Sequence, residues 1–262
     1  MKRHMRILSD YLAQISGIAL GEDKEYLFEM RLKPLMQQTK CDSLHAFAEA
    51  LPQYAKQAEF QKAFIEAMTT NESMFFRDSR PFNVLKQSIL PLLKHKKTVE
   101  FWSCACAAGQ EAYSLAILAQ EAELKAYHIL ATDIDYAMID RAKTGKYSRF
   151  EIQRGLKTEH MLRYFHCEDA HHWNANDVLK KNITFKQDNL LHAHHNKKYD
   201  VILCRYVLIY FDELTKKNII NMLRDCLTKE GILLLGSAET MPADIEGLHP
   251  HPDDRTIFTL SS

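Results

Sequence analysis

The chain has 262 residues, of which 46% are hydrophobic and 26% are charged, proportions typical of a folded globular protein rather than a disordered or fibrous one. Lys plus Arg and Asp plus Glu number 34 each, so there is no overall basic field to hold a nucleic acid. The basic first residues lack the apolar stretch of a signal peptide, and no apolar run is long enough to span a bilayer. We therefore expect a cytoplasmic protein that does not insert into a membrane.

The first part of the chain has the apolar spacing of short helices. Over residues 1–70, apolar side chains recur at intervals of three and four residues, as at Leu8 and Leu12. Pro34 is expected to interrupt or end one of these helices, because proline cannot donate a backbone hydrogen bond. We predict a small helical subdomain over 1–70, followed by a connecting segment over 71–97.

From residue 98 onward, short apolar runs alternate with helical stretches, which is typical of βαβ units around a parallel sheet. Strands are expected at 99–104, 127–132, 183–187, 199–204, 231–236 and 256–260. Helices are expected at 111–122, 136–143 and 214–227. The polar stretch 145–182 is too long for an ordinary connection and predicts an accessory insertion. The pattern therefore predicts an α/β domain over 98–262.

Ligands of such sheets bind beyond the carboxyl ends of the strands. The first strand is followed by the small residues 104–109, which let the backbone approach a ligand closely but match neither a phosphate loop nor a dinucleotide fingerprint. The second strand is followed by Asp133, where an acid commonly accepts hydrogen bonds from ribose hydroxyls. The alternative is that Asp133 or Asp135 only caps the next helix. The spacing alone predicts a generic cofactor-binding domain.

The cysteines and histidines do not indicate a metal site. The six cysteines lack the C-x-x-C spacing of zinc or thiol redox motifs. Histidines cluster at 171–172 and at positions 192, 194 and 195, but without the i, i+4 spacing of a helical ligand pair. We therefore expect no metal.

Six segments carry a recognisable pattern. They are 71–77, 102–114, 131–135, 153–156, 189–191 and 209–212. In this order, and over nearly the whole chain, they resemble the chemotaxis receptor glutamate methyltransferases, the CheR family. The resemblance implies a helical subdomain joined to a Rossmann-like methyltransferase domain, with S-adenosylmethionine held between them. It also implies methyl transfer to glutamate side chains in the cytoplasmic domains of methyl-accepting chemotaxis receptors, and we expect the enzyme to be a monomer.

The resemblance further implies a set of site residues. Those expected at the cofactor are Asn71, Ser73 and Arg77 in the connecting segment, Glu111 and Asp133 at its amino and ribose ends, Asn189 and Leu190 near the adenine, and Tyr206 and Val207 after the fourth strand. The expected catalytic residues are Arg77 and Tyr210, which would only orient the acceptor. A glutamate with a pKa of about 4.3 is already ionised at neutral pH, so the reaction needs no general base.

Two segments depart from the family pattern. The chain has Tyr206 where the family usually reads Cys-Arg-Asn-Val, and 109–112 reads Gly-Gln-Glu-Ala in place of Gly-Glu-Glu-Pro, which leaves Glu111 as the surviving acid. Tyr206 either rebuilds a cofactor contact or fills the cofactor space, and the latter would make the protein a regulatory S-adenosylmethionine-binding module. The other alternative is a methyltransferase with another protein or a nucleic acid as acceptor, although the Pro-Pro pattern of nucleic-acid enzymes is absent after the fourth strand.

Overall fold

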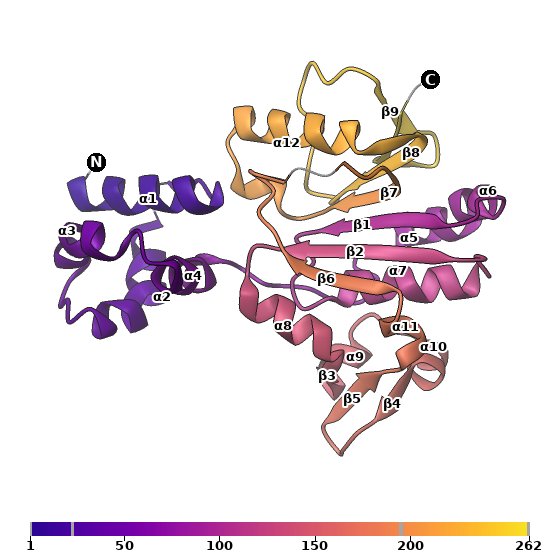
Figure 1. Cartoon of the computed structure of the whole chain (residues 1–262), viewed down its shortest axis with the longest axis horizontal. Helices are drawn as coiled ribbons and strands as arrows, with labels where there is room; N and C mark the ends of the chain where they lie inside the picture. Colours follow the sequence, from indigo (N-terminus) through magenta and orange to yellow (C-terminus); the bar gives the residue numbers. More distant parts are fainter. Residues whose placement is uncertain (1, 22–23, 194–195, 261–262) are drawn as a thin grey trace.

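The computed structural model describes residues 2–21, 24–193 and 196–260, and Figure 1 shows a small helical unit beside a larger α/β unit. The helical unit contains α1 (Arg3–Ser16), α2 (Glu25–Gln38), α3 (Leu44–Tyr54) and α4 (Ala58–Met68). These helices bury their apolar faces in a core of their own, which includes Leu8, Leu12, Phe28, Phe47 and Phe64. The expected helices are confirmed.

The expectation for Pro34 is wrong, because this residue lies inside α2 rather than at its end. Proline removes one hydrogen bond from a helix and leaves a carbonyl group without its donor. Pro34 is exposed, so water can hydrate that carbonyl group. The apolar face of α2, with Phe28 and Leu32 fully buried, keeps the helix in place despite the missing bond.

A seven-stranded sheet forms the centre of the larger unit. Its strands are β1 (Val99–Cys104), β2 (Tyr127–Asp133), β6 (Ile183–Gln187), β7 (Tyr199–Cys204), β8 (Leu227–Leu235), β9 (Leu248–His251) and β10 (Asp254–Leu260). They lie in the order β6-β2-β1-β7-β8-β10-β9. The six expected strands are confirmed, with small shifts at their ends. The sheet is mixed rather than all parallel, because β10 pairs antiparallel with β8 and with β9, a strand that the sequence did not predict.

Helices cover both faces of this sheet (Figure 1). Successive residues of a strand point to opposite faces, so Phe101 of β1 packs into one core and Trp102 into the other. The first core includes residues of α7 (Gln110–Glu121) and α8 (Tyr136–Thr144), and the second includes the apolar face of α12 (Glu213–Asp225). The connecting segment contributes α5 (Ser79–Val84), a π-helical turn (Leu85–Ile89) and α6 (Leu90–Leu93).

A smaller antiparallel sheet interrupts the chain between α8 and β6. Its strands are β3 (Lys146–Ser148), β4 (Phe165–Cys167) and β5 (His172–Ala175), in the order β3-β5-β4. Along the chain, α9 (Arg149–Gln153) and α10 (Thr158–Tyr164) lie between β3 and β4, and α11 (Asp177–Lys180) follows β5. It packs against the connecting segment at Gly155, where an added Cβ atom would lie 2.0 Å from the carbonyl oxygen of Phe75. Only glycine allows this close approach.

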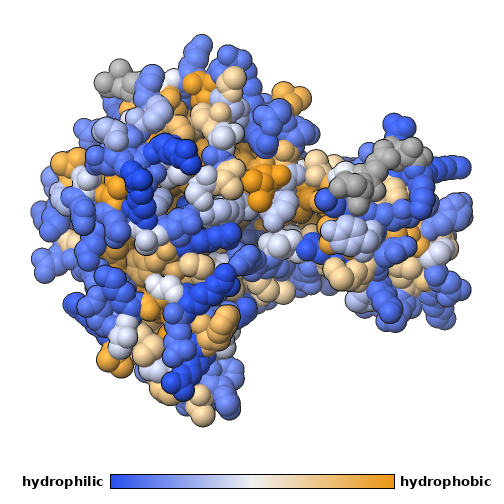
Figure 2. Space-filling view, turned by 180° about the vertical axis from the view of Figure 1, so that it is seen from behind, coloured by the Kyte–Doolittle hydropathy of each residue, from blue (hydrophilic) through white to orange (hydrophobic). Residues whose placement is uncertain are grey.

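The surface is mostly hydrophilic on the face shown in Figure 2, with apolar residues dispersed over it, and the molecule narrows where the two units join. In the part of the chain that the structure describes, no helix is both long and apolar enough to cross a bilayer.

Candidate functional site

A cavity opens where the carboxyl ends of β1, β2, β6 and β7 face the helical unit, and residues of both units line it. In parallel strands these ends share one edge of the sheet, which is the usual ligand position. All ten residues expected at the site from the sequence lie on the wall of this cavity: Asn71, Ser73, Arg77, Glu111, Asp133, Asn189, Leu190, Tyr206, Val207 and Tyr210.

The turn after β1 brings backbone rather than side chains to the cavity. Ala105 and Ala107 have positive φ angles of 55° and 46°, and Gly109, which precedes α7, has a φ of 89°. A non-glycine residue in this conformation costs about 1 to 2 kcal/mol, so the surrounding structure must hold the turn in place. One such contact is the hydrogen bond that the Ala107 N–H donates to Asp133 Oδ2 at 2.8 Å.

Asp133 is the buried acid at the end of β2. Its two oxygens accept backbone hydrogen bonds from Ala107 and, at 2.9 Å, from Asp135. A carboxylate has about four lone-pair sites, so Asp133 retains acceptor capacity for a ligand. Burial raises the pKa of Asp133 to about 6. Asp135, not Asp133, caps α8, because its carboxylate accepts from the Met138 N–H at 3.1 Å. The two acids therefore have separate roles.

The connecting segment is fastened to the start of α8. The Asn71 side-chain amide donates to Asp135 Oδ2 at 2.7 Å, and the Thr69 hydroxyl donates to the same oxygen at 2.8 Å. These bonds hold Asn71 and the neighbouring Ser73 at the cavity wall.

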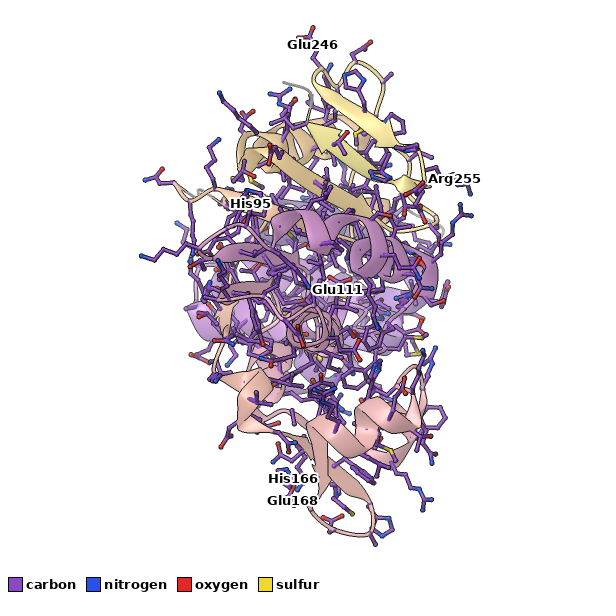
Figure 3. The ribbon with its side chains drawn as sticks, turned by 90° about the vertical axis from the view of Figure 1, so that its right-hand side faces the viewer. His95, Glu111, His166, Glu168, Glu246 and Arg255 are labelled. Carbon is purple, nitrogen blue, oxygen red and sulfur yellow. The ribbon has the colours of Figure 1, made fainter. Side chains whose placement is uncertain are left out.

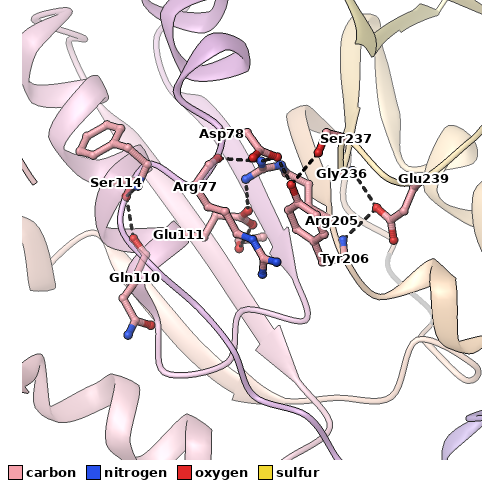
Figure 4. A network of polar contacts seen from close by, with 12 residues as sticks. Arg77, Asp78, Gln110, Glu111, Ser114, Arg205, Tyr206, Gly236, Ser237 and Glu239 are labelled. Carbon is pink, nitrogen blue, oxygen red and sulfur yellow. Dashed lines mark hydrogen bonds and ion pairs between the residues drawn. The ribbon is translucent and has the colours of Figure 1, made fainter. Parts of the chain in front are cut away.

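Glu111 lies near the centre of the molecule (Figure 3), where it pairs with Arg205. The Arg205 side chain is only 2% exposed and donates to Glu111 Oε2 at 3.0 Å, to the backbone carbonyl of Arg77 at 2.7 Å and to Asp78 Oδ2 at 3.2 Å (Figure 4). The Ser103 hydroxyl donates to the other oxygen of Glu111 at 2.7 Å. Among the described residues, the buried Arg205 Nε has no hydrogen-bond partner, and this residue lines the cavity.

The loop after β7 is held by a carboxylate that the sequence analysis did not identify. Glu239 accepts hydrogen bonds from the backbone N–H groups of Tyr206, Val207, Leu208 and Gly236 at 2.7 to 2.9 Å (Figure 4). Burial raises the pKa of Glu239 above its usual value, while these donors act in the opposite direction. This cluster of contacts fixes the backbone that carries Tyr206 and Val207 into the cavity wall.

The helical unit closes the cavity from the other side. Asn189 donates from its side-chain amide to the Ile15 carbonyl at 3.0 Å, and the Ala19 N–H donates to the Tyr210 carbonyl at 2.8 Å. The Asn189 side-chain oxygen accepts from the Leu191 N–H at 3.0 Å, so the amide of Asn189 already joins the two units.

No metal centre is found in the described part of the chain: it holds no group of three or more His, Cys, Asp or Glu side chains placed to bind an ion. His166 and Glu168 project from the far end of the small sheet in Figure 3, well away from Glu111. Two of the clustered histidines, His194 and His195, lie outside the described residues.

Comparisons with known proteins decide the family. The model described as "CheR methyltransferase, all-alpha domain" matches residues 3–69, and "CheR methyltransferase, SAM binding domain" matches residues 71–254. The chain is 36% identical to "Chemotaxis protein methyltransferase 1" of Pseudomonas aeruginosa over 242 residues, which cover 88% of each chain. It is 35% identical to the chemotaxis protein methyltransferase of Vibrio anguillarum over 90% of this chain and 88% of the relative. This chain belongs to the CheR methyltransferase family.

Membership of the CheR family makes the protein an S-adenosylmethionine-dependent methyltransferase. The cavity offers groups that match this cofactor: a buried unpaired N–H of Arg205 suits a carboxylate, and the remaining lone pairs of Asp133 suit ribose hydroxyls. Leu190 and Val207 provide apolar wall, and the turn after β1 allows close approach of the backbone. The residues present therefore fit the cofactor.

The sequence analysis missed Arg205 and Glu239 in this CheR family member. Arg205 had a detectable signal, since an arginine directly after the apolar run 201–204 must be paired when it is buried. Glu239 had none, because three of its four partners, Tyr206, Val207 and Leu208, lie 31 to 33 residues earlier in the chain and meet it only after β8 returns to the cavity edge.

Proposed function

We propose that this enzyme transfers the methyl group of S-adenosylmethionine to glutamate carboxylates of chemotaxis receptors and forms glutamyl methyl esters. The proposal rests on the surroundings of the Arg77 side chain at the cavity wall. Among the described residues, no carboxylate lies within ion-pair distance of Arg77, while its neighbour Glu72 pairs with Arg154 at 2.8 Å. A half-buried guanidinium of this kind can bind a carboxylate that arrives from outside. Relatives named chemotaxis protein methyltransferase support the acceptor class.

We assign the cofactor to the cavity residues as follows. Asp133 accepts from the ribose hydroxyls, and Asn189 and Leu190 border the adenine. Glu111 and the N–H groups of its partner Arg205 bind the amino-acid end of the cofactor. Asn71, Ser73, Arg77, Tyr206 and Val207 complete the wall.

When bound, S-adenosylmethionine supplies an electrophilic methyl group on a positively charged sulfur. An oxygen lone pair of the ionised glutamate forms the new O–C bond as the C–S bond breaks, and sulfur keeps that electron pair. A carboxylate and a sulfonium become a neutral ester and a thioether, and no proton moves.

The residues of this chain contribute placement. Arg77 and Tyr210 orient the acceptor oxygen, and the cavity walls remove water from it, effects that together can supply several kcal/mol. Their hold must be loose, because a carboxylate bonded too strongly is a poor nucleophile.

We further propose that the enzyme works as a monomer in the cytoplasm, where the cytoplasmic domains of the receptors are accessible. The balanced charge of the chain, 34 acidic and 34 basic residues, disfavours a nucleic-acid acceptor.

The test is to incubate the protein with methyl-labelled S-adenosylmethionine and membranes that carry a methyl-accepting receptor. Label is expected in the receptor band, and mild base should release it because a carboxyl ester hydrolyses readily. A receptor with glutamine in place of the methylated glutamates is the control and should stay unlabelled, since an amide is a poor nucleophile. Equal labelling of RNA would refute the acceptor assignment, and cofactor binding without transfer to any acceptor would favour the regulatory module.

A further inference from the structure

Tyr206 has an unusual backbone for its residue type. Its φ is 59°, in the left-handed region where asparagine and glycine are favoured and a bulky residue is strained. Gly236 leaves the space that the tyrosine needs, because a Cβ atom there would lie 3.0 Å from the Tyr206 nitrogen and 3.2 Å from its ring. Glu239 holds the turn by accepting from the Tyr206 N–H at 2.8 Å. The surrounding contacts therefore hold Tyr206 in a strained backbone conformation.

The Tyr206 side chain lies at the cavity wall, and its hydroxyl group also contacts two other residues. Its hydroxyl contacts the carboxylate of Asp78 and lies 2.9 Å from the hydroxyl oxygen of Ser237 (Figure 4). These contacts fix the plane of the ring. The guanidinium carbon of Arg77 lies 3.6 Å from the ring centroid, well within the range of a cation–π interaction.

Arg77 has few other contacts to hold it. Within the described part of the chain, its side chain donates one hydrogen bond, at 3.2 Å, to the Glu72 carbonyl. Arg205 binds the Arg77 backbone carbonyl at 2.7 Å, which fixes the main chain and leaves the long side chain free to rotate. An unrestrained arginine loses considerable rotamer entropy when it binds a carboxylate. A flat aromatic surface beneath the guanidinium removes part of that loss while leaving its N–H edge free.

We infer that Tyr206 is a positioning residue that holds the Arg77 guanidinium toward the acceptor carboxylate, an inference that rests on the proposed role of Arg77. The amide that the family usually has here offers no aromatic face. Tyr206 therefore adds support for Arg77 in addition to its place in the cavity wall.

The first experiment separates the ring from the hydroxyl. Tyr206→Leu is expected to lower kcat/KM for the acceptor about tenfold, equivalent to roughly 1.4 kcal/mol. Tyr206→Phe should recover most of that loss, and in both variants the affinity for S-adenosylmethionine should change less than kcat/KM for the acceptor does. Tyr136→Leu is the matched control, because the Lys62 ammonium lies 5.0 Å from the Tyr136 ring centroid and neither residue is among those that line the cavity. Equal losses in the Phe and Leu variants, or a main effect on cofactor affinity, would overturn the inference.

The second experiment is a double-mutant cycle. If Tyr206 acts through Arg77, Tyr206→Leu should cost nothing more in an Arg77→Ala background, and the same loss in both backgrounds would refute the coupling. Receptor methylation by the parent tests the proposed function separately. Full activity of Arg77→Ala would remove the assigned role of Arg77 and overturn the inference about Tyr206, but it would leave the proposed methyl transfer standing.

A spectroscopic measurement does not depend on turnover. The ring current of Tyr206 should shift the Arg77 side-chain N–H resonance upfield in NMR spectra, with the signal assigned by its loss in Arg77→Ala. The upfield shift is expected in the parent and in Tyr206→Phe but not in Tyr206→Leu. A signal at the ordinary position in the parent would show that the stack does not form.

Discussion

At the scale of single residues, burial shifts the proton equilibrium of Asp133 toward the neutral carboxyl. Burial raises its pKa from 3.8 to about 6, against the opposing effect of hydrogen bonds from the backbone N–H groups of Asp135 and Ala107. A raised carboxyl pKa means that the folded state binds the proton more tightly than the unfolded chain does. The contribution of Asp133 to stability is therefore fully present below pH 3.8 and is lost as pH rises through about 6.

Cofactor binding should show the opposite dependence. The ribose hydroxyls need the ionised form of Asp133 as acceptor, so protonation competes with binding. The Kd for S-adenosylmethionine is expected to rise about tenfold per pH unit below pH 6 and to level off above it. Calorimetry at several pH values measures this, and Asp133→Asn, which cannot ionise, should bind weakly with no such step. An identical pH profile in both proteins would exclude Asp133 as the acceptor.

The positions of the site residues were predictable from the sequence, but their partners were not. Asp133 follows from the rule that ligands lie beyond strand ends, and Arg77 follows from the resemblance of segment 71–77 to the CheR family. Both signals are local in the chain. The contact of Tyr206 with Asp78 joins residues 128 positions apart and depends on how the connecting segment packs across the sheet edge. No residue pattern near Tyr206 encodes that packing.

Among the elements, the predictable ones are those whose own residues are strongly periodic or fully apolar. β1 and β7 are almost wholly buried and were recognised as apolar runs. β9 reads Leu-His-Pro-His and was missed, because an edge strand needs no apolar alternation and tolerates proline at position 250. Pro34 was misjudged for the related reason that tertiary packing, not local propensity, keeps α2 intact.

The loop after β7 contains only a short 3-10 helix, Leu208–Tyr210, and Glu239 accepts hydrogen bonds from backbone N–H groups at its start. Glu239→Ala would leave four backbone N–H groups of the loop and of Gly236 without their acceptor. We expect the free energy of unfolding to fall by about 2 to 4 kcal/mol and cofactor affinity to fall with it. Glu239→Gln, which keeps one acceptor oxygen, should be intermediate.

Chemical denaturation measures the free energy of unfolding, and calorimetry measures the affinity for the cofactor. Glu246→Ala is the control, because this glutamate is exposed in the same stretch of chain (Figure 3). If the Glu239 and Glu246 variants were equally stable, Glu239 would not be the residue that holds the loop.

At the scale of the whole molecule, the two units share the cavity, so cofactor binding and docking of the helical unit are coupled. The contact between the two units depends on Gly17, which ends α1 with a φ of 78°. An added Cβ atom there would lie 2.8 Å from a methyl group of Leu191 and 2.9 Å from the ring of Phe211, on the opposite unit. Close packing across the join therefore requires glycine at this position.

Gly17→Ala should consequently loosen the helical unit and weaken S-adenosylmethionine binding about tenfold, while the α/β unit stays folded. A ligand at 100 times its Kd stabilises a protein by about 2.7 kcal/mol, and a tenfold weaker Kd removes roughly 1.4 kcal/mol of that. The melting temperature, followed as cofactor is added, should thus rise less in the variant than in the parent. Gly247→Ala is the matched control: its φ of 80° imposes the same backbone strain, but the nearest atom to an added Cβ lies 3.7 Å away. The control should lose stability without losing cofactor affinity, and equal behaviour of the two variants would show that contact across the join plays no part in holding the cofactor.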